Sequence, residues 1–161
     1  MAPAQLLAFS TSSSAATLPV TMDRVTRHLG VDNQVSSFVL PVGATINMDG
    51  TSLYQAVAAV FIAQALHSPL DFSDQLTIVL TALLASIGSA AVPGAGMIML
   101  VIVLESIGIP ADKLAVGLAL IFAIDRPLDM CRTVINVTGD AMVSVVVAKS
   151  LGRLYPDDES R

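Results

Sequence analysis

The chain alternates between apolar runs and short polar interruptions, and several interruptions fall inside a run rather than between two. Residues 36–66 hold two apolar runs separated by Asn-Met-Asp-Gly-Thr at 47–51. Each run is too short to cross roughly 30 Å of hydrocarbon, which takes about 20 residues, whereas both together are long enough. We therefore predict one transmembrane helix over residues 32–67, broken in its middle. Broken backbone at membrane depth is tolerated only where it is buried in protein or lines a cavity.

A second apolar stretch, residues 76–104, is interrupted at 86–96 by a segment rich in Gly, Ser, Ala and Pro. Two apolar arms around such a tip form either one kinked span or a re-entrant hairpin that returns on the same side. Pro93 and the glycines at 94 and 96 favour the hairpin, which we predict over residues 72–108.

A Ser-rich run lies near the start, at residues 10–19. Such a run is commonly a flexible linker. This one is short and bounded by apolar residues, and small hydroxyl side chains let the backbone approach a ligand while offering donors and acceptors. The run looks like a second version of the tip at 86–96, so a linker and a hairpin tip both remain open.

The last apolar stretch predicts a transmembrane helix over residues 112–152, followed by a polar tail at 153–161. Pro127 is expected to kink this helix or to mark a local break. At ~100° per residue, one arc of roughly 100° collects the polar side chains of Asp125, Asp129, Arg132, Thr133, Asn136 and Asp140. The opposite face holds Leu128, Val134, Ile135, Val137 and Met142. A soluble amphipathic helix has the same appearance, with its polar face in water.

Composition argues for a membrane protein instead. Hydrophobic residues make up 54% of the 161 residues and charged residues only 13%, whereas a soluble domain has about a quarter of its residues charged. The mean hydropathy is +0.76. There is too little charge to cover a water-facing surface. The predicted fold class is an all-α membrane protein that passes several times through the cell (inner) membrane.

Several other classes of function are excluded. The net charge of −5 arises partly from the acidic residues at 157–159, and no Lys/Arg cluster suggests nucleic acid as a partner. Cys131 is the only cysteine, which excludes disulfides and cysteine-based metal sites, and we interpret it as an apolar packing residue. His28 and His67 lie in polar connecting segments without ligand-like partners. No signal peptide is present, and the abrupt start leads us to expect a fragment of a longer chain.

Ionisable side chains at membrane depth are costly and therefore indicate function by default. A set of mutually paired structural charges is the alternative. The carboxylates outnumber the arginine, so further cations such as Na⁺ or H⁺ are needed, and hard oxygen ligands suit Na⁺. The guanidinium fork is suited to holding a carboxylate bidentately. The residues concerned are Asp49, Asp125, Asp129, Asp140 and Arg132.

Four segments, at residues 12–19, 47–51, 86–96 and 125–140, resemble the signature segments of the dicarboxylate/amino-acid:cation symporters in order and spacing. These are the glutamate and aspartate transporters of bacteria, archaea and animals. The resemblance covers essentially the whole chain and implies that 1–161 is the C-terminal part of a transport domain. Residues 8–22 would then be a re-entrant hairpin tip with its second arm. The scaffold helices that form homotrimers in the family would be missing from this chain.

The resemblance also implies a role for individual residues. Arg132 would bind the side-chain carboxylate of the substrate and Asp129 its amino group, and the two tips would close over it. The implied substrate-binding residues are Ser12, Ser13, Ser14, Thr51, Val92, Pro93, Gly94, Asp129, Arg132, Thr133 and Asn136.

Two or three sodium sites are implied in the same way, with H⁺ as a further coupling ion. The first would use Asn47, Asn136, Asp140 and the backbone of Gly43. The second would use backbone carbonyls near Thr45, Ser86, Ile87 and Ser89. The third would include Asn47 and Asp49 and would be incomplete, because its other ligands would come from an earlier helix.

Substrate choice follows from the same comparison. Arg132 implies an acidic substrate, because neutral-amino-acid members replace it. Asp129 and Asp140 favour glutamate or aspartate over succinate or malate, whose carriers tend to lack both carboxylates. Pro127 departs from the family pattern. A second arginine, expected at the Ser-rich tip or beside Arg132, is replaced by Ser12 or Met130.

The predicted function is sodium-coupled symport of glutamate or aspartate by an elevator-type mechanism, and not an enzymatic reaction. A C4-dicarboxylate or proton-coupled symporter of the same family is one alternative, and a non-transporting truncated fragment is another. A membrane-embedded hydrolase using one of the serines at 12–14 is the third. It is disfavoured because His28, in a charged connection, is a poor base.

Overall fold

The computed structural model describes residues 1–155. Its secondary structure is helical, which confirms the predicted all-α class, and a single isolated bridge between Val31 and Leu154 is the only β-type pairing among the described residues. The helices are α1 (Ala2–Thr11), α2 (Ser14–Arg27), α3 (Asn33–Ile46), α4 (Asp49–Ala65), α5 (Phe72–Ile87), α6 (Ala95–Ser106), α7 (Ala111–Phe122) and α8 (Asp125–Ser150). Most of the predicted polar tail, 156–161, lies outside the described residues.

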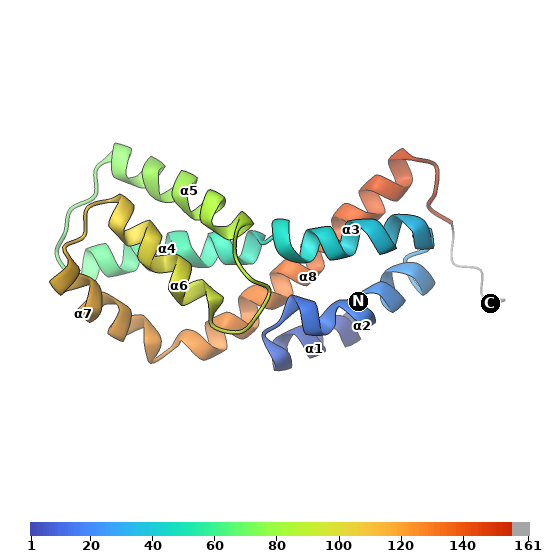
Figure 1. Cartoon of the computed structure of the whole chain (residues 1–161), viewed down its shortest axis with the longest axis horizontal. Helices are drawn as coiled ribbons and strands as arrows, with labels where there is room; N and C mark the ends of the chain where they lie inside the picture. Colours follow the sequence, from blue (N-terminus) through green and yellow to red (C-terminus); the bar gives the residue numbers. More distant parts are fainter. Residues whose placement is uncertain (156–161) are drawn as a thin grey trace.

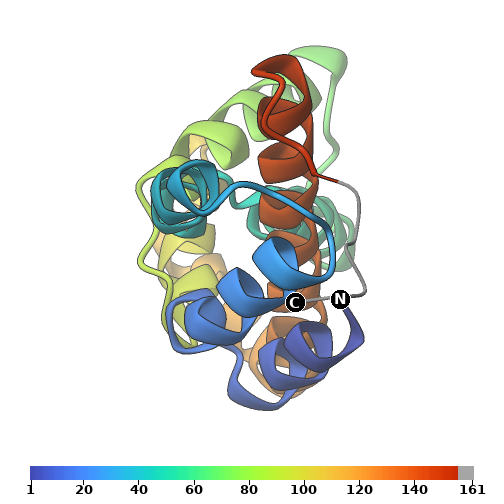
Figure 2. The same cartoon turned by 90° about the vertical axis from the view of Figure 1, so that its right-hand side faces the viewer.

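Two helical hairpins, two longer elements and the short helix α7 make up the described part of the molecule (Figure 1). Helices α1 and α2 form one hairpin, and α5 and α6 form the other. Helices α3 and α4 follow one another nearly end to end, and α8 runs obliquely from α7 to the end where α3 begins (Figure 1). Helix α8 packs against α1, α3 and α4, so it connects the first hairpin with both parts of the interrupted helix pair α3–α4. Figure 2 shows α2, α3 and the C-terminal half of α8 gathered at one end.

The predicted break between the two apolar runs of 36–66 is present. Helix α3 ends at Ile46 and α4 begins at Asp49. Between them, Asn47 (φ −94°, ψ 71°) and Met48 (φ −106°, ψ 58°) leave the helical region of backbone space. The interruption is therefore only two residues long, and the rest of the polar segment forms the first turn of α4. That turn directs polar groups toward α8.

The segment around 86–96 forms a hairpin rather than one kinked helix, because α5 and α6 pack against each other. Helix α5 starts with a reciprocal capping box between Asp71 and Asp74. The chain enters α6 through Gly94, whose φ of 79° is a left-handed conformation that glycine adopts without strain. The sharp turn places the tip of this hairpin at the middle of the molecule (Figure 1).

The Ser-rich run forms the end of α1, a tight turn at residues 12–13 and the start of α2, and is not a flexible linker. Ser12 is left-handed (φ 51°), and the Ser13 side chain caps α2 by accepting a hydrogen bond from the Ala16 N–H at 3.1 Å. The second arm continues to Arg27, beyond the predicted limit at residue 22. Serine suits this turn because its hydroxyl satisfies an N–H group that the helix start leaves free.

The predicted single helix over 112–152 is wrong in one respect, because it is two helices. Helix α7 ends at Phe122 and α8 begins at Asp125. Pro127 is the third residue of α8, where its missing N–H would have no intrahelical acceptor. The proline therefore lies in the first turn after the break and does not kink the helix.

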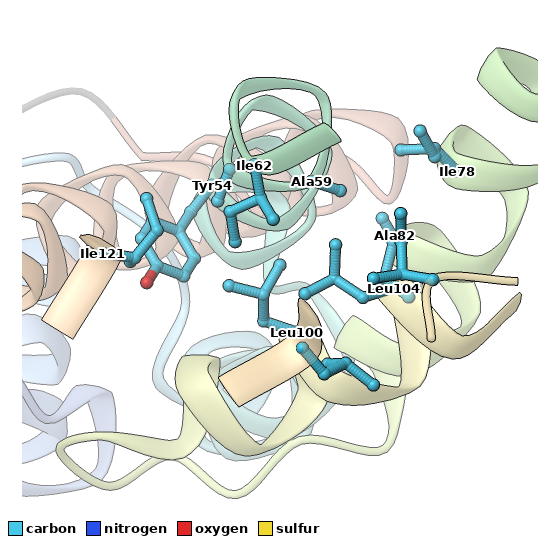
Figure 3. Packing of buried hydrophobic residues seen from close by; sticks show 12 residues of the cluster. Tyr54, Ala59, Ile62, Ile78, Ala82, Leu100, Leu104 and Ile121 are labelled. Carbon is cyan, nitrogen blue, oxygen red and sulfur yellow. The ribbon is translucent and has the colours of Figure 1, made fainter. Parts of the chain in front are cut away.

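The larger apolar core lies among α4, α5, α6 and α7 (Figure 3). In this view Ile121 of α7 lies beside Tyr54 of α4, whereas Ala59 of α4 lies on the side of Ile78 and Ala82 of α5. A second cluster joins α2, α3 and α8 through residues such as Val25, Leu40 and Ala148. The two clusters share no residue, so each hairpin is anchored by its own apolar contacts, α5 and α6 by the first cluster and α2 by the second.

Large apolar side chains are exposed and charged side chains are buried, the opposite of what is usual in a water-soluble protein. Phe38, Phe72 and Phe122 are 71%, 82% and 75% exposed, whereas Asp129 and Arg132 are 2% and 5% exposed. Helix α8 is long and apolar enough to cross a membrane, and α5 and α6 are shorter apolar helices. An apolar exterior around a polar interior is expected where the surrounding solvent is hydrocarbon.

Candidate functional site

The polar stripe of α8 faces the interior of the molecule. Its buried members are Asp129, Arg132, Thr133, Asn136 and Asp140. On the opposite face, Ile135 and Met142 are 43% and 64% exposed, while Val137, expected to lie with them, is buried against α1. The stripe contacts the α3–α4 break and the second hairpin tip, which come from segments far apart in the chain. It is therefore the inner wall of a polar centre and not a water-facing surface.

The Arg132 guanidinium is held on two sides. Its Nε donates to Asp129 Oδ1 at 2.6 Å, and its Nη2 contacts the same oxygen. Its Nη1 donates to the Oγ1 of Thr51, which lies in the first turn of α4, at 2.7 Å. A buried guanidinium needs such partners, since an unpaired buried charge is strongly destabilising. A Cβ on Gly96 would lie 3.4 Å from the Arg132 Cζ and Nε, so the guanidinium also lies against the start of α6.

Asp129 connects α8 to that tip. Its Oδ2 accepts a hydrogen bond from the Gly94 N–H at 3.1 Å, while its Oδ1 faces Arg132. The Thr133 hydroxyl donates to the Asp129 carbonyl at 2.8 Å, a bond within the helix. Val92 and Pro93 are exposed at the tip. The structure thus brings Gly94 to the stripe, whereas these two predicted residues are exposed.

Asn136 fixes the start of α4. Its Oδ1 accepts from the Gly50 N–H at 2.8 Å, and its Nδ2 donates to Thr51 Oγ1 at 3.2 Å. A Cβ at Gly50 would collide with the Arg132 carbonyl oxygen, so only glycine permits this close approach. Gly50 was not among the predicted site residues, although a glycine within the polar break was a visible signal.

The two hairpin tips touch one another. The Ser13 hydroxyl donates to the Ala91 carbonyl at 2.8 Å. Ser12 is 1% exposed, and its Oγ has no hydrogen-bond partner among the described residues. Ser14 is buried as well. A buried hydroxyl without a partner is costly, so Ser12 is available to a bound polar ligand.

Three of the residues predicted for the first cation site, Gly43, Asn47 and Asp140, lie together. Asn47 Nδ2 donates to Asp140 Oδ1 at 3.0 Å, and a Cβ on Gly43 would lie only 2.6 Å from that oxygen. Asp140 is 3% exposed, and within residues 1–155 no basic side chain forms an ion pair with it. A buried carboxylate with only a neutral partner requires a cation or a proton. Its hard oxygen donors fit Na⁺.

The other predicted cation ligands are placed less closely. Asp49 is exposed rather than buried, and Thr45 is exposed with its hydroxyl bonded within α3. Ser86 is buried and donates to the Leu83 carbonyl at 2.8 Å, and Ile87 is 44% exposed. Ser89 is 3% exposed with an unpartnered Oγ. Helices α3 and α5, which carry Thr45 and Ser86, contact each other.

Sequence reasoning missed two partners at the start of α8. Tyr54 donates from its hydroxyl to Asp125 Oδ1 at 2.7 Å, which gives Asp125 a structural role. Arg126 Nη1 lies 3.7 Å from Asp129 Oδ2. Its three-residue spacing from Asp129 was a signal in the sequence. Cys131, interpreted as a packing residue, is exposed.

The close approach at Gly43 leads to a prediction. Gly43→Ala would place a methyl group 2.6 Å from Asp140 Oδ1, so we expect it to displace that carboxylate and weaken Na⁺ binding by about 10-fold or more. Sodium titration of the purified protein, followed by calorimetry, measures this affinity. Val42→Ala, at an exposed position of the same helix, is the matched control. Unchanged Na⁺ affinity in Gly43→Ala would contradict the placement of the ion beside Asp140.

Comparison with known proteins agrees with this geometry. The model of the sodium:dicarboxylate symporter family matches residues 1–150. The chain is 52% identical over 145 residues to excitatory amino acid transporter 5 of Homo sapiens, which covers 90% of this chain and 25% of that protein. It is 51% identical over 144 residues to excitatory amino acid transporter 1 of Homo sapiens, covering 89% of this chain and 26% of the relative.

A relative from Caenorhabditis elegans, named excitatory amino acid transporter, is 52% identical over 144 residues, covering 89% of this chain and 28% of the relative. The chain thus spans about a quarter of the length of these relatives. The matching family consists of sodium-coupled membrane transporters and not of enzymes. The match extends from the first hairpin to the end of α8, so the chain belongs to the sodium:dicarboxylate symporter family.

Proposed function

We propose that this chain supplies the substrate and sodium sites of a symporter that carries glutamate or aspartate across the cell (inner) membrane together with Na⁺. The main support is the buried Arg132, whose guanidinium lies at the meeting point of α4, α8 and the second hairpin tip. A fixed guanidinium fork in a water-poor site is suited to a carboxylate.

Substrate binding is proposed to exchange ion pairs. Arg132 and Asp129 satisfy each other in this arrangement, at 2.6 Å between Nε and Oδ1. An acidic amino acid carries both a carboxylate and an ammonium, so it can take Arg132 with its side chain and Asp129 with its amino group. One internal pair is thereby replaced by two pairs with the substrate. Thr133, Asn136 and the hydroxyl of Ser12, which has no partner within residues 1–155, supply further polar contacts.

Closure is proposed to involve both tips. The Gly94 N–H bonds Asp129, and the Ser13 hydroxyl bonds the Ala91 carbonyl. Val92 and Pro93 continue the second tip on its exposed side. These few hydrogen bonds hold the second tip in place, whereas its two arms, α5 and α6, pack through apolar contacts. The tip can therefore move away from α8 without disrupting either apolar core. The substrate domain would then move as a unit in an elevator-type cycle.

Sodium is proposed to bind first beside Asp140, with Asn47, Asn136 and the Gly43 backbone as neighbours. The support is a buried carboxylate whose hydrogen-bond partner is a neutral amide. A second ion would bind near Thr45, Ser86, Ile87 and Ser89, where the Ser89 hydroxyl has no partner in the described part of the chain. A third ion at Asn47 and Asp49 would need ligands from another segment. The resemblance also supports a lipid bilayer as the surroundings, and a homotrimer only for a longer protein that includes the scaffold helices, because those helices form the trimer in the family.

Calorimetry of the intact protein tests the proposal. We expect aspartate and glutamate to bind in the presence of Na⁺ and to bind at least about 100-fold more weakly without it, because Asp140 then lacks its counterion. Succinate has no ammonium for Asp129 and is expected to bind weakly. Equal substrate affinity with and without Na⁺ would contradict coupling to Na⁺. A substrate affinity that depended on pH instead would favour H⁺ as the coupling ion. Tight succinate binding would favour the C4-dicarboxylate alternative.

A further inference from the structure

Asp129 lies between two guanidinium groups. Arg132 bonds its Oδ1, and Arg126 Nη1 lies 3.7 Å from its Oδ2. The two arginines differ in exposure, since the Arg126 side chain is 57% exposed and the Arg132 side chain 5%. Arg126 is therefore at the open side of the polar centre, with its guanidinium directed to the same carboxylate oxygen that Gly94 N–H contacts.

Helix stability does not explain Arg126. It is the second residue of α8, where the positive end of the helix dipole disfavours a cation. The ion pair joins the exposed guanidinium of Arg126 to the buried carboxylate of Asp129, which is the only carboxylate of the described residues that pairs with Arg126. The position of the charge is thus better explained by what it does at Asp129.

Charge balance indicates that role. Asp125, Arg126, Asp129 and Arg132 together carry no net charge, whereas an acidic amino acid brings two carboxylates and one ammonium. When Arg132 turns toward the substrate carboxylate, Asp129 loses its strongest partner. Without Arg126 the remaining groups would have a net negative charge and repel the substrate, because charges in a site of low dielectric interact strongly.

We propose that Arg126 is a specificity-determining residue that admits acidic substrates. It attracts the anionic substrate to the open side of the site, and it stays beside Asp129 while Arg132 is transferred to the substrate. This inference rests on the proposed function and names a further residue of the same site.

Aspartate binding to Arg126→Gln and Arg126→Lys, in the intact protein at a fixed saturating Na⁺ concentration, tests this role. We expect Arg126→Gln to lower affinity and association rate by about 10-fold at low ionic strength, and by about 3-fold when choline chloride screens the charge. Arg126→Lys restores the charge and is expected to come within about 3-fold of the wild type. Na⁺ binding without substrate remains unchanged.

The matched control is Arg27→Gln, which removes an exposed arginine from an intrahelical pair with Asp23 at the far end of α2. It should leave aspartate binding unaltered. Wild-type affinity and salt dependence in Arg126→Gln would overturn the inference, as would a parallel loss of Na⁺ binding, which would indicate a structural role. Failure of the wild-type protein to bind aspartate would overturn the proposed function itself, and the inference with it.

Discussion

Arg132→Cys is expected to reduce the affinity for aspartate and glutamate by more than about 100-fold and to admit neutral amino acids. The variant removes the guanidinium that contacts Asp129 and Thr51 and leaves a small apolar side chain in its place. Loss of a bidentate charged partner accounts for an effect of this size, since truncating one member of a buried charge pair costs about 2–5 kcal/mol. Calorimetry with acidic and neutral amino acids in saturating Na⁺ measures both changes.

Folding must be separated from binding in this variant. Removing Arg132 leaves the buried Asp129 with Gly94 and Arg126 alone, which costs stability of about 3–5 kcal/mol. Na⁺ titration reports whether the Asp140 region, farther along α8, is intact. Arg27→Cys, at a position with a 77% exposed side chain, is the control for introducing a cysteine. Survival of glutamate affinity in Arg132→Cys would remove Arg132 from the substrate site.

Asp140→Asn is expected to lower Na⁺ affinity by more than about 100-fold and to abolish the stimulation of aspartate binding by Na⁺. Asparagine keeps the size of the side chain and an acceptor for the Asn47 amide, which lies 3.0 Å from Asp140 Oδ1. Only the negative charge is lost. A hard cation depends on such a charge for much of its binding free energy. Na⁺ titration and aspartate calorimetry at several Na⁺ concentrations follow the two effects.

The control for this change is Asp112→Asn, which neutralises an exposed carboxylate in the first turn of α7. It should leave Na⁺ binding as in the wild type. If Asp140→Asn still bound aspartate with the same Na⁺ dependence, the counterion argument for Asp140 would be wrong. Aspartate binding that became strong without Na⁺ would instead mean that the neutral side chain mimics the ion-bound state.

Much of the fold was predictable because it depends on local patterns. The two apolar runs of 36–66, the tip at 86–96 and the stripe on α8 all follow from spacing and residue type. Where the prediction failed, the local pattern was ambiguous. The apolar sequence continues through residues 123–124, so hydropathy alone could not separate α7 from α8. Pro127 was the visible signal, and the break precedes it.

The sequence allowed us to predict which residues form the site but not most of their hydrogen-bond partners. Arg132 and Asp129 are three residues apart on one helix, so their contact follows from helical geometry. Thr51 is 81 residues from Arg132, and only packing of α4 on α8 brings them together. The partner of Asp125 is Tyr54, 71 residues away in the sequence, and only the packing of α4 beside α8 brings them together. The contact of Ser13 with Ala91 likewise depends on the meeting of two tips.

The sequence by itself determined that the protein is an all-helical membrane protein with a polar stripe in an apolar chain and breaks at defined positions. These features arise from hydropathy and backbone preference, which act over a few residues. Tertiary structure alone decided which charges are paired, which hydroxyls remain free and that the stripe faces inward. Those outcomes depend on desolvation and on contacts between distant segments, such as Asp140 with Asn47 and Asp129 with Gly94.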